Sequence, residues 1–154
     1  MSSVSSSRTL HRLIYSSRQT IPAADLDHEV GAIIRASIRN NRTSNVTGLL
    51  LVHQGYFIQA LEGPAEAVMT TFRRILNDPR HEGTRILTAG PATAREFADW
   101  NMCARGMSAA DDAILRTLAQ REAFAPESFS GRSALRLLKA VRGIQNRTQL
   151  KAML

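Results

Sequence analysis

A glutamine in the middle of an apolar strand is the most informative residue of this chain. Residues 45–63 read NVTGLLLVHQGYFIQALEG, two apolar runs separated by a short turn with glycine, which is the pattern of a β-hairpin. Alternation places Gln59 between Phe57 and Leu61 on one face of the second strand. A buried primary amide without partners costs about 1–3 kcal/mol, so a polar group must face Gln59.

Tyr15 is the partner that the strand order supplies. Residues 10–16, LHRLIYS, form a predicted strand with Tyr15 near its C-terminal end. If this strand lies beside the one that carries Gln59, the phenol and the amide come within reach of each other. A phenol can release an electron and a proton, and an amide offers both a donor and an acceptor. The pair is therefore either reactive or an ordinary core hydrogen bond, and the two residues alone leave both alternatives open.

Other reactive constellations have little support. The four histidines, at positions 11, 28, 53 and 81, show neither HxxxH nor HExxH spacing, and the single Cys103 offers no zinc ligand set. The chain has no GxSxG, P-loop or GxGxxG motif, so the hydrolase, nucleotidase and Rossmann classes lack a signature. Cys103 fits a small buried residue better than a nucleophile. We expect neither a metal site nor a catalytic residue.

Composition indicates one soluble globular domain. The 154 residues are 44% hydrophobic and 21% charged, which is enough apolar content for a single core. The serine-rich start lacks the apolar region of a secretory signal, and no stretch reaches the length of a membrane helix. With one cysteine, an internal disulfide is excluded, and we expect a cytoplasmic protein that does not enter a membrane. The net charge of +7 is compatible with nucleic acid, an anionic surface or solubility alone.

Two helices flank the predicted hairpin. Apolar residues at helical spacing predict one helix over 24–39, with acidic residues in its first turn, and another over 64–77. The polar run RNNRTSN at 39–45 predicts a turn between the first helix and the hairpin. Asn40 and Asn41 then lie at the exit of that helix.

Two further strands are predicted after the second helix. RHEG, at 80–83, is a polar connection that leads into a strand over 84–89, and FADWNM predicts a strand over 97–102. The order is βαββαββ, which indicates an α+β, ferredoxin-like sandwich with both helices on one face of the sheet. In that topology strands one and three are neighbours, which brings Tyr15 near Gln59.

The C-terminal part predicts two more helices that cap the other face of the sheet. The first spans 108–124, and the second begins near Ser133 with an apolar side and a basic side. After Glu127 the chain has six basic residues and no acidic one. No aromatic residue lies among these charges to stack on a base, so we expect a solvated or partner-facing helix and no nucleic-acid site.

Five motifs in this order and spacing resemble the BLUF domain, the flavin-based blue-light sensor. They are Tyr15 followed by serines, then NNRTSNVTGLLL, GYFIQALEG, NDPRH and FADWNM. The resemblance begins near Leu10, and it divides the chain into a flavin-binding domain over 8–107 and a helical cap or output segment over 108–154. SALRLLKAV is similar to the C-terminal helix of the short BLUF proteins that lack an effector domain.

The resemblance implies a flavin held between the two helices, usually FAD, with FMN or riboflavin as alternatives. The matching positions that would contact it are Ile34, Ser37, Asn40, Asn41, Gln59, Arg80 and His81. Asn41 would bind the carbonyl edge of the ring, which presents a donor beside an acceptor as an amide does. Arg80 and His81 would approach the ribityl and phosphate end, because phosphate favours cationic donors. A solvated charge at a helix end is the alternative for Arg80.

Tyr15 and Gln59 match the photoactive pair of the family. The resemblance implies that light-excited flavin takes an electron and then a proton from Tyr15 through Gln59, and that the pair recombines with the amide rearranged. Trp100 and Met102 match a pair on strand five that passes the signal outward, although plain core packing is the alternative for both. The implied function is a blue-light photoreceptor.

The expected output is protein contact. About 50 residues beyond the sheet cannot hold an enzyme of ordinary size, so we expect the C-terminal helices to act on the protein's own subunits or on a separate protein. A homo-oligomer is expected. An enzyme on the same sandwich and an interaction module without photochemistry are the alternatives. The enzyme would need an acid, a base or a nucleophile, and the predicted pocket offers amides, a phenol and a thioether.

Overall fold

The apolar strands assemble into one five-stranded sheet in the order β4-β1-β3-β2-β5. In the computed structural model, which describes residues 9–98, 102–104 and 126–153, the strands are β1 (Leu10–Gln19), β2 (Thr47–His53), β3 (Tyr56–Pro64), β4 (His81–Pro91) and β5 (Met102–Ala104). The first four strands pair antiparallel, and β5 runs parallel to β2. The predicted α+β class and the adjacency of the first and third strands are confirmed.

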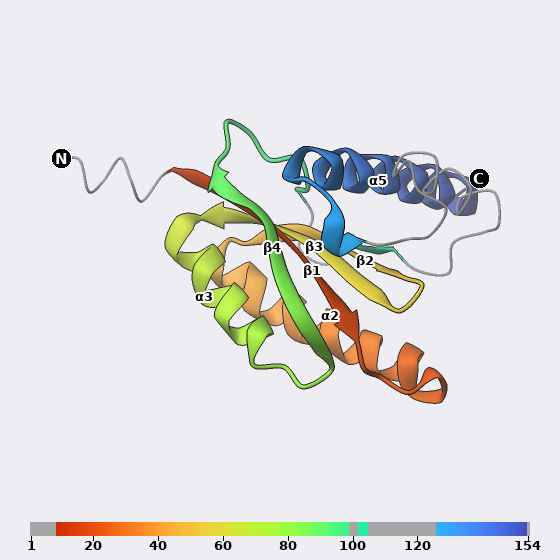
Figure 1. Ribbon diagram of the computed structural model, residues 1–154. Coiled ribbons are helices and arrows are strands. Elements are labelled where there is room, and N and C mark those ends of the chain that lie inside the picture. Colours follow the sequence, from red (N-terminus) through yellow and green to blue (C-terminus); the bar gives the residue numbers. More distant parts are fainter. Residues whose placement is uncertain (1–8, 99–101, 105–125, 154) are drawn as a thin grey trace.

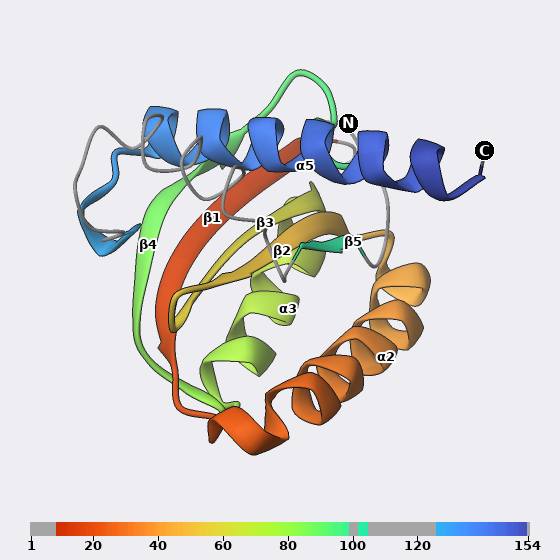
Figure 2. The same ribbon diagram turned by 90° about the vertical axis from the view of Figure 1, so that its right-hand side faces the viewer.

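Helices cover both faces of this sheet. The helices α2 (Leu26–Ser44) and α3 (Ala65–Leu76) lie on one face, and α5 (Gly131–Met153) lies across the other (Figures 1 and 2). Two short 3-10 turns, Ala23–Asp25 and Pro126–Ser128, precede α2 and α5. Of the two predicted capping helices, α5 is confirmed, and the one over 108–124 lies outside the described residues. No helix in the described part of the chain is long and apolar enough to cross a membrane.

Burial on both faces explains the unbroken apolar run of β2. Leu50 and Val52 pack with Val30 of α2, while Leu49 and Leu51 pack in the core cluster of α5. A strand covered on both sides needs apolar residues at every position, which is why LLLV does not alternate. The two helical layers therefore fix which face each side chain of the central strands occupies.

The predicted turn over 39–45 is wrong, because α2 continues to Ser44. The run contains no glycine or proline to end the helix, and the Ser44 hydroxyl donates to the Asn40 carbonyl at 3.0 Å. Asn45 ends the helix in the left-handed conformation with φ 60°. Asn40 and Asn41 consequently lie on the last turns of α2, and Asn41 is buried.

The boundaries of the last two strands also differ from the prediction. Residues 80–83 were expected to connect, but β4 begins at His81, because His81 and Glu82 pair with the end of β1. A register shift near Gly83, which has φ 64°, accommodates this extension. The expected strand over 97–102 is displaced: Phe97 precedes the strand, and β5 covers Met102–Ala104.

Candidate functional site

Tyr15 and Gln59 meet across the β1–β3 pair. They are direct register partners, and the Tyr15 hydroxyl donates to Gln59 Oε1 at 2.5 Å. Tyr15 is 2% exposed and packs against the Phe72 ring of α3 at a centroid distance of 5.6 Å. The predicted meeting of the phenol and the amide is confirmed. Because Gln59 accepts through its oxygen, both of its N–H donors remain for a further acceptor.

The surroundings keep the phenol protonated. Burial, and secondarily the Asp78 carboxylate, raise the pKa of Tyr15 above its ordinary value. A neutral phenol is a hydrogen-bond donor, so Tyr15 holds Gln59 in the orientation with the oxygen toward β1.

A cleft opens beside this pair, between α2, α3 and β3. It consists of two adjoining cavities of about 200 Å³ and about 50 Å³ that share lining side chains. The shared side chains are Ile33, Ser37, Gln59, Ile75, Asp78 and Arg80. Asn40 and Asn41 line the larger cavity, and Tyr15 and His81 line the smaller one. The structure thus brings most of the sequence-predicted site residues to one cleft.

The donor set of this cleft fits a flavin. Amides from Asn40, Asn41 and Gln59 offer the mixed donors and acceptors that the edge of a flavin ring requires. Apolar side chains of Ile33 and Ile75 can cover the faces of a ring.

One predicted residue lies outside the cleft, and the roles of two others stay predictions. Ile34 packs with the buried cluster of Val30 and Leu50 and lines neither cavity, so its flavin contact stays a prediction. Met102 lies on β5, as predicted, where it pairs with Leu49 of β2. The strand β2 separates β5 from β3, which carries Gln59, and the signalling role of Met102 stays a prediction. Trp100 lies outside the described residues, so its role also stays a prediction.

Arg80 is held by two carboxylates at the cleft. Asp78 accepts from Arg80 Nε at 2.8 Å and from Nη2 at 2.5 Å, and Glu29 of α2 lies 3.4 Å from Nη1. The hydrogen bond from Arg80 holds the pKa of Asp78 below its ordinary value. These contacts fix the guanidinium between α2 and the end of α3.

The His81 ring is fixed through both nitrogens. Nδ1 lies 2.7 Å from the Ser17 hydroxyl of β1, and Nε2 lies 2.7 Å from the Ile75 carbonyl oxygen of α3. A carbonyl only accepts, so Nε2 carries a proton in this arrangement. His81 therefore links the end of α3 to β1 through these two contacts, and its side chain lines the smaller cavity.

Sequence reasoning missed three polar residues that line the larger cavity. They are Thr71, Arg74 and Asp78. Asp78 had a usable signal, because an aspartate two residues before Arg80 can cap the backbone N–H of Arg80, here at 2.9 Å. Arg74 and Thr71 are three residues apart on α3, a spacing that places them on one helix face.

Asp78→Asn should weaken the protein at neutral pH and make it less sensitive to acid. Because the folded-state pKa of Asp78 is lowered, its stabilisation is present above the unfolded value of about 4 and is lost as pH falls through the folded value. The pair is partly exposed and solvent screens it, so we expect an effect on the order of 1 kcal/mol. Urea unfolding of both proteins at about pH 7 and about pH 3 measures it. An equal difference at the two pH values would contradict this account.

Comparisons with known proteins agree with the geometry. The family model "BLUF: Sensors of blue-light using FAD" matches residues 10–103. The photoactivated adenylate cyclase subunit beta of Euglena gracilis is 38% identical over 95 residues, which are 61% of this chain and 11% of that protein. The blue light- and temperature-regulated antirepressor BluF of Escherichia coli K12 is 38% identical over 74 residues, 48% of this chain and 18% of that protein.

A solved structure extends the similarity over most of the chain. The dark-state structure of BlrB, a BLUF protein, superposes with a TM-score of 0.67 at 32% identity and covers 90% of this chain and 98% of that chain. By contrast, the chain spans 11% of the length of the Euglena cyclase subunit. The cleft with its Tyr15–Gln59 pair, the family match and this superposition agree: the chain belongs to the BLUF family of blue-light sensors, which bind flavin.

Proposed function

We propose that Tyr15 and Gln59 are the photoactive pair of this chain. The observation that carries the proposal is the 2.5 Å hydrogen bond from a buried, protonated phenol to an amide that also lines the cleft. One end of the amide faces Tyr15, and the other is available to a ligand in the cleft. A change in the hydrogen bond between Tyr15 and Gln59 would therefore change the hydrogen bond between Gln59 and a bound flavin.

A bound flavin would supply blue-light absorption and an acceptor for one electron and one proton. When Tyr15 gives up an electron, its phenol becomes strongly acidic, and the proton moves along the short bond toward Gln59 Oε1. Return of the electron and the proton restores Tyr15. The Gln59 amide, whose two ends differ only in donor and acceptor character, is left rotated or tautomerised. The lit state is then a changed hydrogen-bond network with no net redox product.

The other cleft residues would hold the cofactor. We assign the ring edge to Asn41, with Asn40 and Ser37 beside it, because these polar side chains line the larger cavity. Arg80 is assigned to the ribityl and phosphate end, where its carboxylate partners keep the guanidinium in place. His81 is assigned to the same end, and its contacts with Ser17 and Ile75 would keep the ring in place there.

We propose that the output is protein contact through the segment 108–154. The chain's α5 lies on the sheet face opposite α2 and α3, which line the cleft (Figure 2), and a change in how α5 docks on the sheet would alter the surface that it offers to a partner. The E. coli relative is an antirepressor by name, which favours a regulatory protein as the partner, with a second copy of this chain as the other candidate.

The purified protein, reconstituted with FAD, should be yellow, and blue light should shift its flavin absorption reversibly to the red. Parallel samples with FMN and riboflavin show whether the phosphate end contributes to affinity. Recovery in darkness, followed by absorption, tests the absence of a net redox product. A protein that binds none of the three flavins would refute the proposed function, as would bound flavin without a red shift.

A further inference from the structure

Glu62 is a fully buried carboxylate that the photochemistry does not use. It lies on β3 three residues after Gln59, on the opposite face of the strand. Its Oε2 lies 2.7 Å from Nε of Arg12, which belongs to the neighbouring strand β1. A buried charge is retained only where it is paired and hydrogen-bonded, so the remaining contacts of Glu62 decide its role.

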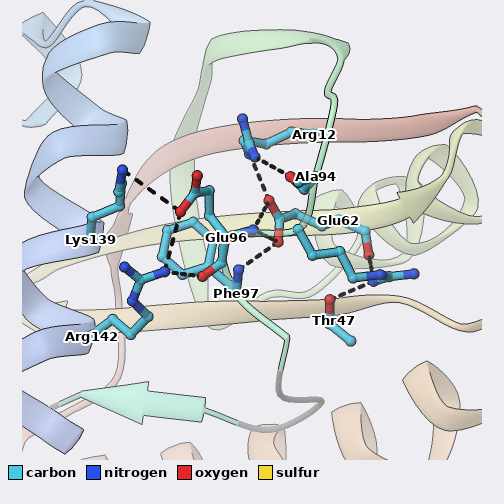
Figure 3. Close-up of polar contacts among 9 residues, drawn as sticks. Arg12, Thr47, Glu62, Ala94, Glu96, Phe97, Lys139 and Arg142 are labelled. Carbon is cyan, nitrogen blue, oxygen red and sulfur yellow. Dashed lines mark hydrogen bonds and ion pairs between the residues drawn. The ribbon is translucent and has the colours of Figure 1, made fainter.

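Those contacts go to the backbone of the segment that leads into β5. The N–H of Glu96 donates to both carboxylate oxygens at 3.0 Å, and the N–H of Phe97 donates to Oε1 at 2.7 Å. The Arg12 side chain adds a bond to the Ala94 carbonyl oxygen at 2.9 Å. Figure 3 shows these bonds converging on one carboxylate, and we call this group, Glu62 with Arg12, Glu96 and Phe97, the Glu62 clamp.

The same segment is held from the other side by α5. Arg142 donates to the Glu96 carbonyl oxygen, and its Nη1 also lies 3.4 Å from Glu96 Oε2 (Figure 3). Lys139 Nζ lies 3.7 Å from that oxygen. The Arg142 guanidinium is 5.8 Å from the centre of the buried Phe97 ring. Over residues 131–143, the part of α5 whose side chains are described, both ion pairs end on Glu96.

Building on the photoreceptor function above, we propose that the Glu62 clamp carries the light signal from β3 to α5. Gln59 and Glu62 share one strand, and a strand is stiff over the roughly 10 Å between them. Close-packed, hydrogen-bonded contacts do not stretch gradually but move between discrete arrangements. A shift of β3 therefore displaces the backbone of Glu96 and Phe97, because both N–H groups are bonded to Glu62. Arg142 and Lys139 then pass the shift to the helix.

This route is distinct from a side-chain exchange on β5. It runs from the Glu62 carboxylate to the backbone N–H groups of Glu96 and Phe97, and all three residues precede β5 in the chain. It also reaches α5 at the turn of the helix that bears Lys139 and Arg142. The turn of α5 with Lys139 and Arg142 is therefore the part that receives the signal. Hydrogen exchange of its individual backbone amides can measure the response.

The test is hydrogen exchange of the FAD-loaded protein in darkness and under blue light. In the parent chain, light should change the protection of the α5 amides around residues 139–142. Arg142→Met keeps the aliphatic stem but removes the bonds to Glu96. It should leave the red shift intact and reduce the light–dark difference in α5 by about threefold or more.

Two variants complete the experiment. Arg136→Met is the matched control, because Arg136 is exposed on the same helix and forms no ion pair with any residue that the structure describes. Glu96→Gln neutralises the carboxylate that pairs with Arg142 and Lys139 but keeps the backbone carbonyl that accepts from Arg142, so it should reduce the light–dark difference in α5 less than Arg142→Met does. If α5 loosens in darkness in Arg142→Met and Glu96→Gln and not in the control, the contacts between Glu96 and α5 hold the helix as proposed.

The outcomes separate this inference from the function on which it rests. An unchanged light response of α5 in Arg142→Met and Glu96→Gln would overturn the clamp as the route. A parent chain with a red shift but no response in α5 would overturn it too and would leave the photoreceptor function in place. A parent chain without a red shift would refute the proposed function itself.

Discussion

Replacing Gln59 with leucine should abolish the light-induced red shift while flavin remains bound. Leucine is of similar size, but it cannot accept the 2.5 Å bond from Tyr15 or present donors to the cleft. The buried hydroxyl is then left without this acceptor, which costs about 1–3 kcal/mol of stability. Difference absorption spectra before and after blue light measure the shift, and the ratio of flavin to protein absorbance checks cofactor retention.

Tyr15→Phe should give the same spectral result from the other side of the bond. It removes both the proton donor and the source of the electron and leaves the ring that packs against Phe72. Tyr56, the second tyrosine of the chain, is a matched control. It lies three residues before Gln59 on β3, so its side chain is on the face of the strand opposite to Gln59. Tyr56→Phe should keep the red shift. A normal shift in Gln59→Leu or Tyr15→Phe would reject the photoactive pair.

Glu62→Gln should be among the most destabilising single substitutions in this protein. The amide keeps the shape of the side chain, but it has one oxygen where the carboxylate offers two to Arg12 and to two backbone N–H groups. Removing one partner of a buried ion pair leaves the other charge uncompensated, so we expect a loss of about 3 kcal/mol or more in the free energy of unfolding. Denaturant unfolding in darkness measures this loss.

Glu66→Gln is the matched control for that experiment. Glu66 is exposed in the first turn of α3, where the loss of a negative charge costs about 0.5 kcal/mol through the helix dipole. If the two variants unfold at the same denaturant concentration, Glu62 does not clamp the segment before β5. A large loss in Glu62→Gln with a normal red shift would show that the clamp and the photoactive pair are separate devices on one strand.

The predictions that held rest on short-range periodicity. The hairpin followed from two apolar runs around a turn, and it appears as β2 and β3. The helical stripes over 24–39 and 64–77 appear as α2 and α3 within a few residues. Chain order alone then placed Tyr15 opposite Gln59, because few topologies connect such elements with short crossovers.

The predictions that failed concern polar runs. Residues 39–44 are helical and His81–Gly83 belongs to β4, although turn-forming residues are common in both runs. In each case the backbone gains regular hydrogen bonds from a neighbour, the rest of α2 or the end of β1, and these outweigh weak local preferences. The strand expected over 97–102 is displaced, since β5 covers Met102–Ala104 and the N–H of Phe97 donates to the Glu62 side chain instead of to a strand.

The sequence by itself determined the fold class and the Tyr15–Gln59 pair, which depend on the order of the elements, and the two faces of the central strands, which depend on the alternation of side chains. Only the tertiary structure decided which partners the charged side chains have. Glu62 meets residues 34 and 35 positions away along the chain, and Arg80 meets Glu29 across 51 positions. No local pattern encodes such partners, since they depend on which loops the packed helices bring to each end of the sheet. Gln59 can be recognised in the sequence as a polar residue in an apolar strand. The role of the buried Glu62 can be recognised only from the structure, where the backbone of Glu96 and Phe97 donates to its carboxylate.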